Sequence, residues 1–225
     1  MKVFGFAALA ACAVALPASA QGLDALWNPH TYLDGAYVEG TGGSTFQGAT
    51  TEFNSAPGDA NKGSGHFNAG YFGSATFGKR VAPGLSFELE GVYFNNHYNR
   101  ATELTQDTAG SSRTYGGLAN VRLSLPYDYH VYRQIALVPY IGVGAGYGNT
   151  HYRTSAPLDD SQSGLLWQAK TGLEIKTGTP ISFDVGYRYI GTPDYSQNFI
   201  GPAGDESFRL RSHVQAATAG VKYTF

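Results

Sequence analysis

Apolar and polar residues alternate along several stretches of the chain, as they do in a β-strand with one apolar and one polar face. The clearest example is LSFELEGVYF at 85–94, where apolar positions alternate with Ser86, Glu88 and Glu90. The same alternation marks 114–125, 167–176, 181–189 and 218–225, and three weaker runs cover 32–41, 67–78 and 140–148. The pattern therefore predicts eight strands.

The connections between these strands alternate in length. Short breaks are predicted at 79–84 and 177–180, a medium one at 127–136, and long polar breaks at 42–65, 96–113, 154–164 and 192–206. Antiparallel strands joined in this way place all the short turns at one end. This meander predicts an all-β fold, an eight-stranded antiparallel up-and-down transmembrane β-barrel.

A soluble barrel or sandwich would show the same period, so the distribution of charge has to separate the two architectures. Charges on the polar strand faces are few and balanced five against five, which suits a closed interior where each ion has a partner. Aromatic residues end the apolar faces, as interfacial girdles do. We therefore predict lipid-facing apolar surfaces around a lumen that holds an ionic network. Its predicted members are Glu39, Glu88, Glu90, Glu174 and Asp184 with Arg122, Lys170, Lys176, Arg188 and Lys222.

The first 20 residues carry the features of a secretory signal peptide. Lys2 precedes an uncharged apolar run at 3–16, and 18–20 (ASA) supplies a small-residue cleavage site. The apolar run is shorter than the roughly 20 residues of a spanning helix. We predict a signal peptide at 1–20 and a barrel domain at 21–225. An alternative is a lipobox at 9–12, in which Cys12 would be lipidated.

Composition agrees with an exported barrel. Cys12 is the single cysteine, so the chain after cleavage would have no disulfide. The 30 Gly, 16 Tyr and 13 Phe disfavour helices, and the aromatic residues favour strands. The formal charge of −2, or −3 without Lys2, is too mild to indicate a nucleic-acid partner.

Glu88 and Glu90 are two residues apart and share the polar face of one strand. They would serve either as a general acid/base pair or ion gate, or as structural carboxylates neutralised by Arg122 on the next strand. We favour the structural role, because an unpaired buried carboxylate is costly. An eight-stranded barrel is only just wide enough to be filled by its own side chains, so the ionic cluster is predicted to plug it.

No motif indicates catalysis, a cofactor or a metal. The six histidines show no spacing such as HExxH, and Ser212 and His213 are neighbours that point to opposite faces of a strand. GAGYG at 144–148 lacks the strand-to-helix context of a phosphate loop. We expect the glycines at 142, 144, 146 and 148 to make room in the lumen for larger side chains such as Tyr37 or Arg188.

Four segments resemble strands of the opacity-type and OmpA-like small outer-membrane β-barrel proteins: SFELEGVYF, VPYIGVGAGYG, FDVGYRYIG and the terminal AGVKYTF. The resemblance implies a place in the cell outer membrane and contact with outer-membrane lipid. It also implies that the barrel-assembly machinery recognises the terminal aromatics, with Tyr223 and Phe225 as the assembly signal. Two features depart from the family: the turn at 126–137 is long, and residues 21–31 precede the first strand. No peptidoglycan-binding domain follows Phe225, so anchoring to the cell wall is not implied.

These observations predict a non-catalytic outer-membrane protein that supports envelope integrity and surface interaction. The Gly/Ser/Thr/Asn-rich segment 42–65 is expected to be mobile and exposed. It would bind a surface ligand or host-cell partner, or merely shield the surface. The alternative function is a narrow small-solute channel gated by the lumen charge pairs. A secreted soluble barrel is the third possibility.

Overall fold

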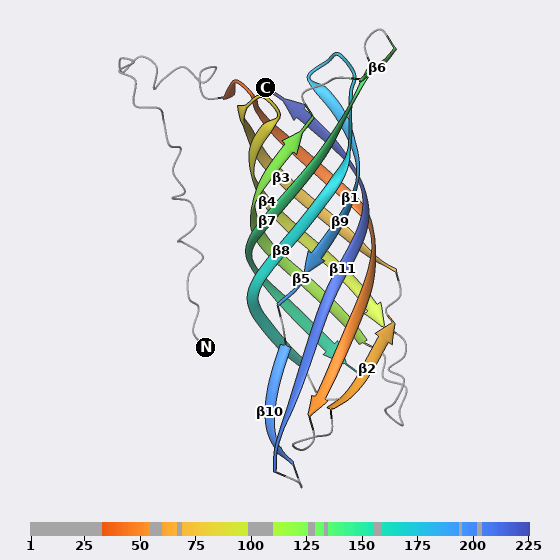
Figure 1. The fold of residues 1–225 in the computed structure, drawn as a ribbon, viewed down its shortest axis with the longest axis vertical. Coiled ribbons are helices and arrows are strands. Elements are labelled where there is room, and N and C mark those ends of the chain that lie inside the picture. The colour runs from red at the N-terminus through yellow and green to blue at the C-terminus, as the bar shows by residue number, and fades with distance from the viewer. Residues whose placement is uncertain are drawn as a thin grey trace, which may run out of the picture. The chain divides into compact units, whose positions relative to one another are not determined.

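Eight long antiparallel strands form the walls of a closed barrel in the described part of the chain (Figure 1). The computed structural model describes residues 33–54, 60–66, 69–98, 110–125, 129–132, 135–154, 159–193, 195–201 and 204–225. The wall strands are β1 (Ala36–Asn54), β3 (Gly70–Ala82), β4 (Leu85–Tyr98), β5 (Gly110–Ser124), β7 (Ile135–Thr154), β8 (Asp159–Lys176), β9 (Ile181–Gly191) and β11 (Gly204–Thr224). Each pairs with the next, and β11 pairs back with β1 from Tyr37↔Thr224 to Asn54↔Ser207. The predicted eight-stranded up-and-down barrel is confirmed.

Three short strands lengthen hairpins of this barrel. β2 (Ala60–His66) pairs with the end of β1, and β10 (Tyr195–Gly201) pairs with the start of β11. β6 (Tyr129–Tyr132) pairs with the start of β7, so the medium break predicted at 127–136 contains a paired strand. In Figure 1, β6 lies at the same end of the barrel as the C-terminus, and β2 and β10 lie toward the opposite end.

The tight connections fall at the end that carries β6 and Phe225, which we call the short-turn end. Between β3 and β4 the chain turns at Gly84, whose φ of 75° is left-handed and favours glycine. The carbonyl oxygen of Gly84 accepts a hydrogen bond of 2.7 Å from the amide of Ser124. Gly178 turns the chain between β8 and β9 in the same way, with a φ of 72°. The opposite end is the long-loop end.

The strands run further toward the long-loop end than the alternation predicts. The first strand, predicted to end at residue 41, continues to Asn54, and the last begins at Gly204 rather than near 218. Segments 42–54 and 60–66 are therefore paired strand, and the prediction of a loop there is wrong. The physical reason is that ladder hydrogen bonds join backbone groups and need no apolar alternation. The predicted mobility of 42–65 stays a prediction. Residues 55–59 lie outside the described residues, as does the predicted signal peptide.

Side chains alternate between lumen and exterior as the sequence predicts. On β4, Glu88 and Glu90 are buried in the lumen, whereas Phe87 and Leu89 are more than half exposed on the outside. This inside-out arrangement leaves large apolar side chains around the whole outer wall. The described residues contain no helix that is long and apolar enough to cross a membrane.

Candidate functional site

Arg122 on β5 is the centre of a charged cluster in the lumen and is 1% exposed. Its Nη1 donates to Glu39 at 3.2 Å and lies 3.8 Å from Glu88. Its Nη2 donates to Glu174 at 2.8 Å and lies 3.6 Å from Asp184. Carboxylates from four strands, β1, β4, β8 and β9, therefore share one guanidinium, and its planar fork of donors suits such multiple pairing.

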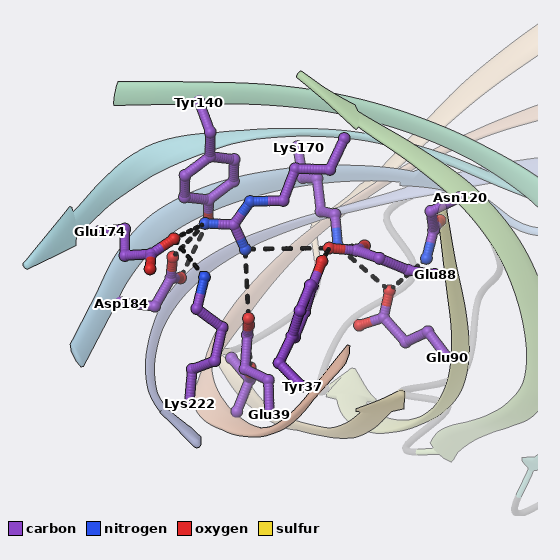
Figure 2. Close-up of polar contacts among 12 residues, drawn as sticks. Tyr37, Glu39, Glu88, Glu90, Asn120, Tyr140, Lys170, Glu174, Asp184 and Lys222 are labelled. Carbon is purple, nitrogen blue, oxygen red and sulfur yellow. Dashed lines mark hydrogen bonds and ion pairs between the residues drawn. The ribbon is translucent and has the colours of Figure 1, made fainter. Parts of the chain in front are cut away.

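A second group of contacts extends the cluster along β4. The Lys170 ammonium donates to Glu88 at 2.5 Å and lies 3.6 Å from Glu90. Arg188 also pairs with Glu90, which accepts hydrogen bonds from Asn120 at 2.9 Å and from Gln168 at 2.6 Å. Figure 2 shows Lys170, Asn120 and Glu90 grouped around this side of the lumen. Glu88 links the two groups because it lies near both Lys170 and Arg122.

Two tyrosines complete the cluster. The Tyr37 hydroxyl donates to Glu88 at 2.6 Å, and the Tyr140 hydroxyl donates to Asp184 at 2.9 Å (Figure 2). The Arg122 guanidinium carbon lies 3.7 Å from the centroid of the Tyr140 ring, which adds a cation–π contact. Tyr140 is not among the lumen residues predicted from the sequence. Its position two residues before Gly142 on one strand face would have placed it in the lumen.

The predicted network residues occupy the places that the alternation gives them. Nine of the ten are buried in the lumen, and Lys176 is half-buried on the same face at the end of β8. Lys222 pairs with Glu174 across the cluster. We call these nine residues the ionic layer: Glu39, Glu88, Glu90, Arg122, Lys170, Glu174, Asp184, Arg188 and Lys222.

The lumen glycines make room for side chains as predicted. The prediction that Tyr37 or Arg188 occupies the room beside the glycines of 142–148 is wrong. A Cβ at Gly144 would collide with the Asn120 side chain, and one at Gly142 would press on Lys170 at 3.1 Å. The Tyr37 ring is accommodated at Gly78 on β3 instead. The reason is register, since a glycine on β7 clears space for residues on the strands next to it, β5 and β8.

A second layer of the lumen is apolar, and it was not predicted from the sequence. We call it the apolar layer: Phe72, Val92, Phe94, Leu118, Leu166, Ile190, Val214 and Ala216, each at most 4% exposed. Its members lie nearer the long-loop end than the ionic-layer residues of the same strands, as Leu166 does relative to Lys170. The signal was available in the sequence, because Val92 continues the face of Glu88 and Glu90.

The predicted assembly residues lie on the outside at the short-turn end. Tyr223 is 44% and Phe225 49% exposed, and their ring centroids are 5.2 Å apart in an edge-on arrangement. The Phe225 amide donates to the Ala36 carbonyl at 3.0 Å, so the last residue closes the seam between β11 and β1. Its role as an assembly signal stays a prediction.

The chemistry available in the lumen is charge neutralisation and space filling. Each carboxylate of the ionic layer lies within 4.0 Å of at least one cation. Among the residues that the structure describes, no group of three or more His, Cys, Asp or Glu side chains is placed to hold a metal ion.

The family profile of the outer membrane protein beta-barrel domain matches residues 4–225. The chain belongs to this family. It is a protein of the cell outer membrane, its outer wall faces membrane lipid, and the predicted localisation is confirmed. In barrels of this class the short turns are periplasmic and the long loops extracellular, which orients this outer-membrane barrel.

Solved structures of other outer-membrane proteins are similar to this chain, and the first of them shows the same fold. The outer membrane protein OprG from Pseudomonas aeruginosa matches with a TM-score of 0.57 and 13% identity, over 85% of this chain and 97% of that one. Neisserial surface protein A matches with a TM-score of 0.46 and 19% identity, over 85% and 98%. Ail, the attachment invasion locus protein of Yersinia pestis, matches with a TM-score of 0.30 and 12% identity, over 82% and 99%. By sequence, no curated protein matches this outer-membrane barrel.

Proposed function

We propose that this outer-membrane barrel is non-catalytic and plugged, and that it supports envelope integrity and surface interaction. The observation that supports the plug is the position of Arg122, buried at the centre of the lumen among four carboxylates. A solute crossing the barrel would have to separate these ions. Breaking a buried pair by losing one partner costs about 3–5 kcal/mol.

The apolar layer adds a second barrier on the extracellular side. Phe94, Leu166, Ile190 and Val214 are fully buried there, so the lumen is filled by side chains at this level too. A hydrated ion would lose water at the apolar layer before it reached the charges of the ionic layer, and burying an unpaired charge is strongly unfavourable. The two layers together favour a closed barrel over a narrow small-solute channel.

Surface interaction would use the extracellular end, where β1, β2, β10 and β11 extend the hairpins. Extended strands raise loop residues away from the membrane, where a surface ligand or host-cell partner would reach them. Assembly would follow recognition of Tyr223 and Phe225 by the barrel-assembly machinery. Both side chains point outward at the periplasmic edge, where a partner protein has access.

Planar-bilayer recording tests the plug. The purified barrel is first shown to be membrane-inserted by fractionation and by a shift in gel mobility on boiling. We expect the wild type to give no stable channels. Stable wild-type channels whose conductance changes on Glu88→Ala or Arg122→Ala would refute the plug and establish a channel gated by the ionic layer.

Complementation tests the two cellular roles separately. A strain without the protein should be more sensitive to detergent and should attach less to surfaces. A variant with 55–59 deleted should restore detergent resistance but not attachment. Restoration of both by that variant would contradict a role for this segment in surface interaction.

A further inference from the structure

Among the described residues, few charged side chains lie on the lipid-facing wall. Carboxylates and cations are not distributed equally between this wall and the lumen. The strand carboxylates whose side chains the structure describes all face the lumen. At the extracellular end, the described outward positions instead carry two exposed arginines, Arg113 on β5 and Arg153 on β7. Among the outward side chains that the structure describes at this end, the charge is therefore positive.

The two arginines lie close together. The register places Arg113 opposite His151 and places Ser111 opposite Arg153. Arg113 and Arg153 are thus diagonal neighbours on one face of adjacent strands, with Cα atoms about 7–8 Å apart by ordinary sheet geometry. Two guanidinium groups at this spacing suit a phosphorylated ligand, because each can form two hydrogen bonds to one phosphate.

The depth of Arg113 is set by the aromatic residue next to it. Tyr115, two residues from Arg113 on the same face, is 50% exposed, and Tyr147 on β7 is 62% exposed. Tyrosines of such girdles sit at the boundary between hydrocarbon and headgroups. Arg113, one step beyond Tyr115 on the same face, therefore lies at the level of the headgroup phosphates, and Arg153, three steps beyond Tyr147 on its own strand, lies further toward the extracellular side. Toward the periplasm the wall continues with exposed apolar side chains such as Val143 and Leu165.

A polar patch on the neighbouring strands borders the same position. Asn95 lies opposite Arg113 in the β4–β5 register, and its amide nitrogen donates to the Tyr71 hydroxyl at 3.2 Å. The Tyr71 and Tyr93 rings are 5.9 Å apart beside it. Asn95 itself is buried, at 3% exposed, so the hydroxyls of the exposed Tyr71 and Tyr93 are the groups suited to the sugar hydroxyls of a glycolipid.

We propose that the cationic rim formed by Arg113 and Arg153 binds the phosphate groups of lipopolysaccharide in the outer leaflet, whose acyl chains then lie against the apolar wall below. A ligand with phosphates, sugars and acyl chains in this order matches the arginines, the polar patch and the apolar wall together. A soluble anion would use the arginines alone. Asp159 lies opposite Arg153 in the β7–β8 register, so Arg113 is expected to contribute more to binding.

Native mass spectrometry of the full-length folded barrel in detergent micelles tests this proposal. The probes are bisphosphorylated lipid A, dephosphorylated lipid A with the same acyl chains, and phosphatidylglycerol. We expect Arg113→Gln to weaken binding of bisphosphorylated lipid A about fivefold, because one arginine near an anionic lipid surface contributes about 1 kcal/mol. Adding Arg153→Gln should weaken it further, and dephosphorylated lipid A should bind poorly to the wild type.

Arg80→Gln is the matched control, because Arg80 is an exposed arginine at the periplasmic end of β3. It should leave binding unchanged, and a gel shift on boiling confirms that each variant is folded. The proposal is overturned if Arg80→Gln weakens binding as much as Arg113→Gln, or if dephosphorylated lipid A or phosphatidylglycerol binds as tightly as the bisphosphorylated form. It is also overturned if millimolar inorganic phosphate displaces the lipid, since the rim would then bind free anions.

Discussion

Arg122→Met should destabilise the barrel more than any single loss of a carboxylate around it. The ionic layer holds five carboxylates and four cations, so removing Arg122 leaves five against three. Methionine keeps much of the apolar volume against Tyr140, and the loss is therefore chiefly electrostatic. Leaving buried carboxylates without their cation costs about 3–5 kcal/mol, which is the expected drop in the free energy of unfolding.

Glu39 provides the test of this reasoning. Within the described residues, its ion pair is with Arg122, and its other carboxylate oxygen accepts from Thr41 at 3.1 Å. Glu39→Gln leaves four carboxylates and four cations, so we expect it to cost less than about 1.5 kcal/mol. In the double variant Arg122→Met/Glu39→Gln, the free energy of unfolding should fall by less than the sum of the two single losses. The difference should be about 1–3 kcal/mol.

Urea unfolding in lipid vesicles, followed by gel mobility without boiling, gives the four stabilities of this cycle. Arg122→Lys is the matched control, because it keeps the charge but not the fork of donors, and it should fall between wild type and Arg122→Met. A loss below about 1 kcal/mol for Arg122→Met would refute the electrostatic account. Additivity of the two substitutions within about 0.5 kcal/mol would refute the pairing with Glu39.

Two further predictions concern the apolar layer and the C-terminus. Leu166→Ala should cost about 2–5 kcal/mol because it opens a cavity in the apolar layer, whereas Leu165→Ala, which faces lipid, loses contact with hydrocarbon but opens no cavity and should cost less; equal losses in urea unfolding would contradict the assignment of faces. Phe225→Asp should reduce the yield of heat-shifted barrel in the outer membrane far more than deletion of 55–59, because Phe225 lies at the closing seam. Equal yields from these two variants would count against the assembly role.

The sequence predicts the barrel well because its faces are locally encoded. A side-chain period of two places Glu88, Arg122 and Lys170 inside without any knowledge of pairing. Balanced charge on those faces, with apolar residues on the other, then identifies which face is buried. The strand number and the end that carries the short turns follow from the spacing of the breaks.

Strand ends and lumen contacts are not encoded in this way. A strand outside the bilayer needs no apolar face. The sequence of 42–54 therefore predicts a loop, although its backbone pairs with β11. Contacts across the lumen join residues distant in the chain, such as Arg122 and Glu39, 83 positions apart. Such pairs depend on the three-dimensional position of each strand around the barrel, which alternation along one strand does not specify.

The apolar layer lies on the extracellular side of the ionic layer, and this order affects the strength of the ion pairs. Ion pairs are strong only where water is excluded, because the effective dielectric constant sets their energy. Leu118 and Leu166 cover the ionic layer on its extracellular side, where the barrel faces the medium outside the cell. Arg122 is 1% exposed beneath them. The apolar layer thus maintains the low-dielectric surroundings in which one arginine can hold carboxylates from four strands, and the proposed plug depends on both layers.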